Sequence, residues 1–172
     1  QQWGIHVANL ANNHILEHGV EAAIDTAGNL ERFGIHVVGA GKSGLFDQGI
    51  GADIFPSEKP EIIIIGACFH PGTYAYNGGG DESDLIRSVE NYSEKGLRVL
   101  VTVHWGDDFT DRPGPEQRVL AKRLLNAGAT AIIGHHPHVV QGFERRDGQL
   151  IAYSLGNFIF DSLTKDERWS VI

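Results

Sequence analysis

The chain has 172 residues, of which 41% are hydrophobic and 21% charged, and its formal net charge is -8. This length suits one domain with a buried core, and this composition excludes a disordered acidic tail and a coiled coil. The basic residues form no run, which argues against binding to nucleic-acid phosphates. The single cysteine, Cys68, excludes an intrachain disulfide and a cysteine-based zinc finger. The longest apolar stretch, around 62–65, is far too short to span a membrane.

The two ends of the sequence indicate a piece of a larger protein. The first residues lead directly into the apolar run 5–8, with neither an initiator Met nor a signal-peptide pattern. Residues 168–172 are typical of a strand that is cut off as it begins. We therefore expect residues 1–172 to form a single partial domain, truncated at both ends. Any association with a membrane would depend on segments outside the chain.

Strands and helices are predicted to alternate along the chain. The predicted strands are short apolar runs, several of them β-branched, at 5–10, 62–67, 99–103, 131–133 and 150–154. The predicted helices have apolar residues at helical spacing, over 20–34, from 81 or 83 to 96, and over 115–128. Residues 39–60 and 69–80 are expected to be loops, with one short helical turn near Leu45. This alternation predicts an α/β fold.

Polar clusters directly follow four of the predicted strands. They are Asn12-Asn13-His14, His104, His135-His136-Pro137-His138 and Asn157. Open α/β sheets place their sites at the carboxyl ends of strands, so four such clusters together predict one convergent site. No Walker loop or Gly-x-Ser-x-Gly elbow occurs, and no nucleotide cofactor site is predicted.

The histidine cluster at 135–138 is the strongest chemical signal. Neutral imidazoles are the commonest metal ligands, and three of them in four residues are hard to explain by packing alone. The pattern therefore favours a metal over hydrogen-bonding histidines. Pro137 disfavours a helical His136 and pushes it toward extended conformations, so we expect a turn around His136 and His138. His135 is the odd one out, facing outward or supporting a ligand from behind.

The other clusters are ambiguous one at a time. A histidine at a strand end, such as His104, is more often structural, but the nearby histidine cluster favours a ligand role. Asp107 and Asp108 either orient that ring or cover the loop with solvated charge. Asn12-Asn13-His14 either caps the next helix or supplies an amide ligand followed by a proton donor. Asn157 is typical of a turn.

Taken in chain order, these segments resemble the bacterial poly-γ-glutamate capsule synthesis family, the CapA-like or PGA_cap proteins. The resemblance covers Leu10 to about Asp161, and its pieces are specific only as a set. Two positions depart from the family pattern while keeping a carboxylate: Glu17, and Asp107 or Asp108 after His104-Trp105-Gly106. The matching pieces are 10–14 with Gly19, 39–41, 104–106, 134–139 with Gln141, and 153–158.

The resemblance implies a branch of the calcineurin-like metallophosphoesterases, built as a β-sandwich flanked by helices and here lacking its first strands. It implies that Asn13, His104 and His136 hold one metal and that His138 holds its neighbour. His14 would be the general acid or stabilise the transition state. The cofactors would be two divalent ions, with Mn, Zn and Fe not distinguished, and further carboxylates would come from segments outside the chain.

In function, the resemblance implies a metal-dependent hydrolase of phosphoester type in capsule polymer synthesis at the cell envelope. Its substrate would be an anionic polymer or a phosphoester. The alternative is a non-catalytic subunit that handles the polymer or acts as a scaffold, with a vestigial metal site. A net charge of -8 would repel a polyanion unless metals or a local basic patch intervene. We also expect an unpaired sheet edge beside strand 5–10, which would favour a homodimer.

Overall fold

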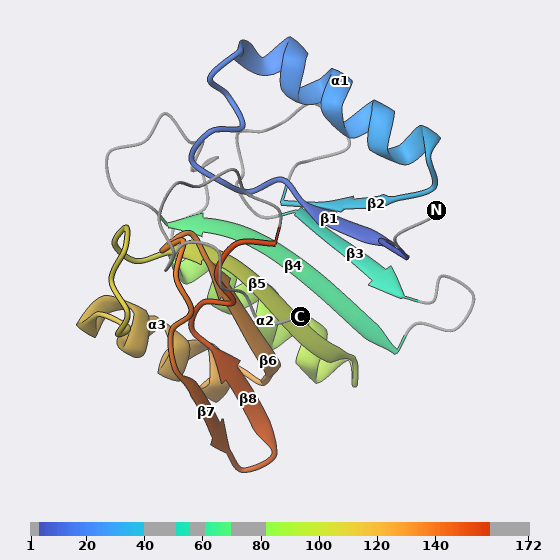
Figure 1. Cartoon of the computed structure of the whole chain (residues 1–172). Helices are drawn as coiled ribbons and strands as arrows, with labels where there is room; N and C mark the ends of the chain where they lie inside the picture. The colour runs from blue at the N-terminus through green and yellow to red at the C-terminus, as the bar shows by residue number, and fades with distance from the viewer. Residues whose placement is uncertain (1–3, 40–50, 56–60, 70–81, 159–172) are drawn as a thin grey trace.

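The computed structural model describes residues 4–39, 51–55, 61–69 and 82–158. These residues form two sheets and three helices (Figure 1). The strands are β1 Val7–Asn9, β2 His36–Val38, β3 Gly51–Phe55, β4 Ile62–Phe69, β5 Arg98–Trp105, β6 Ala129–His135, β7 Phe143–Arg146 and β8 Gln149–Ala152. The helices are α1 Gly19–Arg32, α2 Glu82–Glu94 and α3 Pro115–Asn126. Among the described helices, none is long and apolar enough to cross a membrane.

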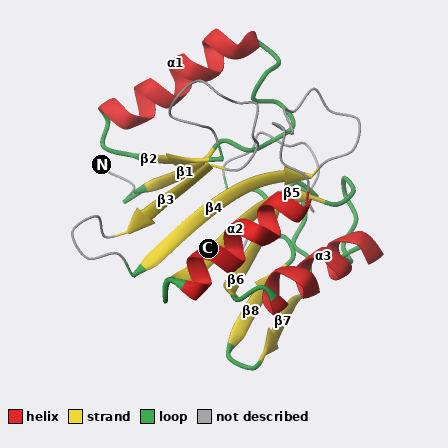
Figure 2. Cartoon of the chain, turned by 180° about the vertical axis from the view of Figure 1, so that it is seen from behind, coloured by secondary structure: helices red, strands yellow, loops and turns green. Residues whose placement is uncertain are grey.

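The larger sheet has the strand order β3-β4-β5-β6-β8-β7. Strands β4, β5, β6 and β8 run parallel to one another. At the two edges, β3 pairs antiparallel with β4 and β7 pairs antiparallel with β8. Helices α2 and α3 connect β4 to β5 and β5 to β6, and both cover the same face of the sheet (Figure 2). The prediction of an α/β fold is therefore confirmed.

The smaller sheet pairs β1 with β2 in parallel and carries its own helix. Helix α1 packs on it through Ala23, which contacts a cluster that includes Leu10 and Val37. Strand β2 also lies against β3 and β4, so the small sheet sits beside one edge of the large sheet (Figure 1). This placement brings the carboxyl end of β1 toward the carboxyl ends of the large sheet's parallel strands.

The main core lies between the large sheet and the helices α2 and α3. Each fully buried aliphatic side chain contributes about 1.5–3 kcal/mol relative to an exposed one. Alternate residues of β5 point into this core because successive side chains of a strand face opposite sides. The fully buried aliphatic side chains of the core include Ile63, Ile65, Leu85, Val89, Val99, Val101, Val103, Leu124 and Ile132.

Three strands were not predicted. The assignment of 39–60 to loops is wrong at β3, because residues 51–55 pair in antiparallel register with β4 at the sheet edge. Strand β2 has only three residues, and β7 is exposed along its whole length, so neither carries an apolar period. The helical turn expected near Leu45, most of the loop expected over 69–80, and the strand start expected at 168–172 lie outside the described residues.

Candidate metal centre

The four polar clusters meet at the carboxyl ends of the strands. His104 and His135 are register partners at the ends of β5 and β6. Asn13, which follows β1, places its Oδ1 atom 2.9 Å from Nε2 of His104. His138, which follows β6, places Nδ1 2.7 Å from Oδ1 of Asn157, which follows β8. Segments from both sheets therefore converge on one place.

One group of side chains at this place is suited to hold a metal ion. Asp108, His136 and His138 each offer one ligand atom, and these atoms lie within 4.8 Å of one another. The imidazole of His136 is buried, and its Nε2 atom lies 3.5 Å from Oδ1 of Asp108. One carboxylate and two imidazoles are a donor set that fits Zn²⁺, Mn²⁺ or Fe²⁺. The sequence identified both histidines, but it left Asp108 as a residue that orients a ring or is merely solvated.

The loop after β5 delivers Asp108 to the two histidines. The backbone N–H of Phe109 donates to the carbonyl of Pro137 at 2.8 Å. The ring of Phe109 also stacks on His138, with the two ring centroids 5.8 Å apart. These two contacts on the next residue fix the position of Asp108. The only sequence signal for this role was the place of Asp108 soon after His104.

His136 and His138 both have positive backbone φ angles, 106° and 60°. This region is sterically costly for residues other than glycine, by about 1–3 kcal/mol each, and such strain clusters at functional sites. The expected turn around the pair is present. The expectation that Pro137 keeps His136 extended is wrong, because the contacts that hold the turn override the local preference.

Asn157 fixes which nitrogen of His138 faces the centre. The side-chain Nδ2 of Asn157 donates to the carbonyl of His138 at 3.2 Å, which sets the orientation of the amide. Its Oδ1 atom therefore accepts from Nδ1–H of His138. The lone pair of His138 is then on Nε2, in the arrangement typical of a metal-binding histidine supported from behind. Asn157 thus does more than shape a turn.

His135 supports the centre instead of facing outward. Its Nδ1 atom lies 2.8 Å from Nδ1 of His104, and its Nε2 atom lies 2.9 Å from Nδ2 of Asn9. Loss of hydration on burial, with His136 as a smaller cause, lowers the pKa of His135 from 6.5 to about 4. The ring is therefore neutral at pH 7. The expectation that it faces outward is wrong, and the expectation that it supports a ligand agrees with these contacts.

His14 lies on the turn that follows β1, and its side chain is 63% exposed. Its Nδ1 atom lies 2.6 Å from a carboxylate oxygen of Glu17. The turn itself is held by Asn12, whose Oδ1 accepts from the backbone N–H of His14 at 2.8 Å. Among the predicted ligands, the described contacts join Asn13 to His104 and bring the ring of His104 within 4.5 Å of that of His136. The role of His14 as an acid stays a prediction.

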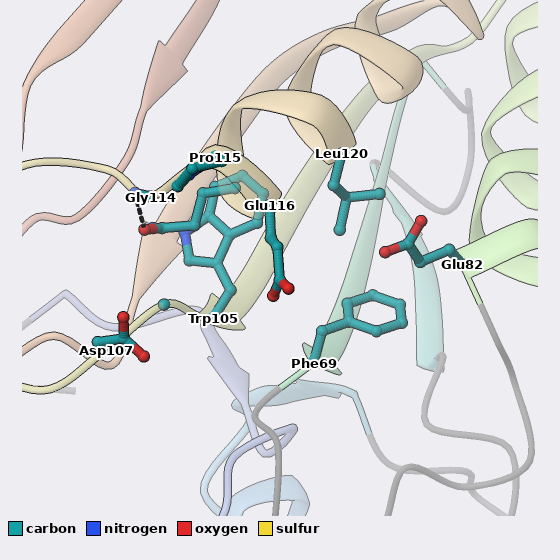
Figure 3. Close-up of a pocket in the computed structure, with 10 residues that line it drawn as sticks. Phe69, Glu82, Trp105, Asp107, Gly114, Pro115, Glu116 and Leu120 are labelled. Atoms are coloured by element: carbon teal, nitrogen blue, oxygen red, sulfur yellow. Dashed lines mark hydrogen bonds between the residues drawn. The ribbon is translucent and has the colours of Figure 1, made fainter.

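A cavity of about 470 Å³ lies on the helix side of the sheet (Figure 3). Its walls include Phe69, Trp105 and Leu120, together with the carboxylates of Glu82 and Glu116. Successive residues of β5 point to opposite faces, so Trp105 faces this cavity and His104 faces the candidate metal centre. None of Asn13, His104, His136 and His138 lines the cavity.

Comparison with known proteins gives a consistent set of relatives. Residues 1–162 match the family described as "Bacterial capsule synthesis protein PGA_cap". Over 175 residues the chain is 33% identical to the "Capsule biosynthesis protein CapA" of Bacillus anthracis, covering 95% of the chain and 43% of that protein. Over 162 residues it is 35% identical to the "PGA biosynthesis protein CapA" of Bacillus subtilis (strain 168), covering 90% of the chain and 42% of that protein. The chain therefore spans less than half the length of these two relatives.

Proposed function

Because this chain belongs to the PGA_cap family of bacterial capsule synthesis proteins, as its motifs indicated, we propose that it forms part of a metal-dependent hydrolase of phosphoester type. The observation that carries the proposal is the approach of Asp108, His136 and His138 within 4.8 Å of one another. The names of the two Bacillus relatives support a role in capsule and PGA biosynthesis. The proposed polymer is poly-γ-glutamate, and the proposed place of its synthesis is the cell envelope.

The described residues fit a divalent ion. Asp108 supplies a negative charge, and His138 presents Nε2 because Asn157 accepts from its Nδ1–H. His136 directs Nε2 toward the carboxylate of Asp108 from a buried position. A bound ion would polarise a substrate oxygen and activate a water molecule near neutral pH. These three residues would accordingly hold the ion.

The fuller proposal is a two-metal centre of the calcineurin-like type, in a β-sandwich flanked by helices. In it the residues described above are divided between two ions: Asn13, His104 and His136 hold one and His138 holds the other, with Asp108 close to both histidines of the group. His14, exposed on the turn after β1, donates a proton to the leaving group, with its ring oriented by Glu17. The proposal assigns the further carboxylates to parts of the parent protein outside residues 1–172.

The test uses the full-length parent protein and two matched variants. Asp108→Asn removes the carboxylate from the proposed centre, whereas Asp147→Asn removes an exposed one in the β7–β8 turn. Metal content is measured after dialysis against Mn²⁺ or Zn²⁺, and turnover is measured on phosphomonoester, phosphodiester and γ-glutamyl-peptide substrates. We expect wild type and Asp147→Asn to bind metal and turn over at least one substrate, and Asp108→Asn to lose both properties.

Two results would contradict the proposal in different ways. Equal metal content in wild type and Asp108→Asn would show that Asp108 does not bind the metal and would contradict the proposed centre. If metal-loaded wild type turns over none of the substrates, the proposed hydrolase activity is contradicted and the second candidate function is favoured.

The second candidate is a non-catalytic subunit that handles the polymer or acts as a scaffold. One observation favours it: Asn13 and His104, two predicted ligands, hydrogen-bond to each other at 2.9 Å, as purely structural residues do. Such a protein would bind poly-γ-glutamate without cleaving it. Polymer binding by light scattering or calorimetry, beside the turnover assay, distinguishes the two functions.

A further inference from the structure

The orientation of the Asn9 side chain, at the end of β1, is set by the backbone. The N–H of Ala11 donates to Oδ1 of Asn9 at 2.9 Å, and a backbone N–H is only ever a donor. The oxygen and the nitrogen of this amide are therefore not interchangeable. The side chain also fills space left by two glycines, because a Cβ atom on Gly39 or Gly66 would lie 2.2 or 2.4 Å from the Asn9 oxygen.

This orientation is passed on through two histidines. The Nδ2 atom of Asn9 donates to Nε2 of His135 at 2.9 Å, so Nε2 carries the lone pair of that ring and Nδ1 carries its proton. That proton is donated to Nδ1 of His104 across 2.8 Å. His104 accepts at Nδ1 and carries its own proton on Nε2. The Nε2–H group then donates to Oδ1 of Asn13 at 2.9 Å, which completes a consistent set of donors and acceptors.

We propose that Asn9 and His135 are positioning residues that hold the proton of His104 on Nε2. Coordination of a metal by Nε2 of His104 requires the opposite tautomer, with the proton on Nδ1. His135 would then turn an N–H toward the Nδ2 amide of Asn9, placing donor against donor. Turning the Asn9 amide over moves the same conflict to the N–H of Ala11.

Without metal, Asn9 and His135 therefore keep His104 as a hydrogen-bond donor beside Asp108, His136 and His138. They oppose its use as a ligand, because the two-metal arrangement proposed above requires both rings to exchange tautomers. The opposition of Asn9 and His135 to coordination by His104 rests on the proposed metal centre. The tautomer of His104 does not, because it is a property of the chain without metal. A failure to find catalytic turnover would leave the tautomer unaffected.

The direct test is nuclear magnetic resonance of the metal-free full-length protein with ¹⁵N-labelled histidine, near neutral pH. Long-range proton–nitrogen spectra distinguish a ring protonated at Nδ1 from one protonated at Nε2. The signals of His104 and His135 are assigned by their loss in His104→Gln and His135→Gln. We expect Nε2–H on His104 and Nδ1–H on His135. A wild-type His104 protonated on Nδ1 overturns the proposal.

A second test reverses the chain of donors. Asn9→Asp keeps the shape of the side chain but presents only acceptors to His135, so both histidines should exchange tautomers. The Zn²⁺ affinity should then rise about tenfold or more, the size of effect typical of residues behind a ligand. Asn12→Asp adds the same charge on the neighbouring turn without contacting His135, and should leave both tautomers as in wild type. Unchanged tautomers in Asn9→Asp overturn the positioning role, and exchanged tautomers with unchanged Zn²⁺ affinity overturn the opposition to coordination.

Discussion

His136 and His138 have backbone conformations that a residue with a Cβ atom rarely adopts, at φ angles of 106° and 60°. The cost is about 1–3 kcal/mol for each, and it persists only where the surroundings determine the conformation. Here those surroundings are visible: Asn157 holds the carbonyl and ring of His138, and Phe109 holds the carbonyl of Pro137. The strained turn is therefore supported by residues outside the group that would bind metal.

Removing one of these supports should weaken metal binding without removing a ligand. Asn157→Ala leaves the Nδ1–H of His138 without its acceptor, so the imidazole loses its fixed orientation. We expect the affinity for Zn²⁺ or Mn²⁺ to fall about 10–100-fold, measured by calorimetry on the full-length protein. Asn126→Ala, an exposed substitution at the end of α3, is the control. An Asn157→Ala affinity equal to that of the control would contradict the supporting role.

Two histidine variants should separate a ligand from an acid. His138→Ala removes an imidazole of the proposed centre, so metal content and rate should both fall. His14→Ala removes the proposed proton donor, so kcat should fall roughly 10²–10⁴-fold while metal content stays near wild type. Metal analysis of the two purified variants beside wild type checks the contrast. If His14→Ala loses as much metal as His138→Ala, the segment 12–14 supplies a ligand and His14 is not the acid.

At this scale the sequence located histidines better than carboxylates. His136 and His138 stand in a spacing that packing rarely produces, so their pattern was informative. Asp108 follows another aspartate in a polar loop, and contacts of the folded chain, including those of Phe109, place it at the centre. His135 was ambiguous because its partner Asn9 lies 126 positions away in the sequence.

At the scale of the elements, β6 owes its close contact with β5 and β8 to a glycine. A Cβ atom on Gly134 would lie 2.0 Å from the carbonyl oxygen of Tyr153 and 2.3 Å from Nε1 of Trp105. These are the two atoms of a buried hydrogen bond of 2.9 Å. Gly134 thus leaves the space in which Trp105 is anchored, one residue before the histidine cluster.

Filling this space should destabilise the protein. We expect Gly134→Ala to lower the free energy of unfolding by about 1–3 kcal/mol, as overpacking of a well-packed core does. The matched variant is Gly28→Ala in α1, where a Cβ atom meets nothing within 4 Å. It should raise the free energy of unfolding by about 0.5–1 kcal/mol, because alanine favours a helix more than glycine does. Denaturant unfolding of both variants measures the two changes in the free energy of unfolding, which should have opposite signs. A Gly134→Ala protein as stable as wild type would contradict the expectation.

Helices and strands with a periodic apolar pattern were predictable from the sequence. Strands that form mainly because they pair with a neighbouring strand were not. The helix starting at Pro115 and the strand over 99–103 carry local signals, and both are confirmed. Strand β7 reads Phe-Glu-Arg-Arg and is exposed, so nothing in its own composition indicates a strand. The neighbouring Asp147-Gly148 pair was an available signal, since both residues have positive φ angles in the hairpin to β8.

At the scale of the whole molecule, β1 is an edge strand of the smaller sheet. Among the described strands, β1 pairs only with β2, so no described strand covers its other edge. Such edges are templates for pairing with another chain. The edge is short and is flanked by Ile5, whose side chain is exposed.

We therefore expect residues 1–172, expressed alone, to self-associate through the edge of β1. Light scattering across a range of protein concentrations should show a dimer or larger species. Ile5→Lys places a charge beside the edge and should shift the population toward monomer, whereas Val119→Lys, an exposed site on α3, should not. A monomer at every concentration would refute the expectation.

Hydrogen bonds beside the candidate centre join distant parts of the chain, with 91 positions from Asn13 to His104 and 126 from Asn9 to His135. Contacts at such separations form late in folding, because the entropy of closing long loops opposes them until most of the chain is in place. In the unfolded chain nothing holds Asp108 beside His136 and His138, because the contacts that place it there belong to the folded loop after β5. Metal would therefore bind the finished fold far more tightly than any early intermediate, and by mass action it would stabilise that fold. Metal depletion would then increase the unfolded fraction of the protein, and proteases would degrade the protein faster.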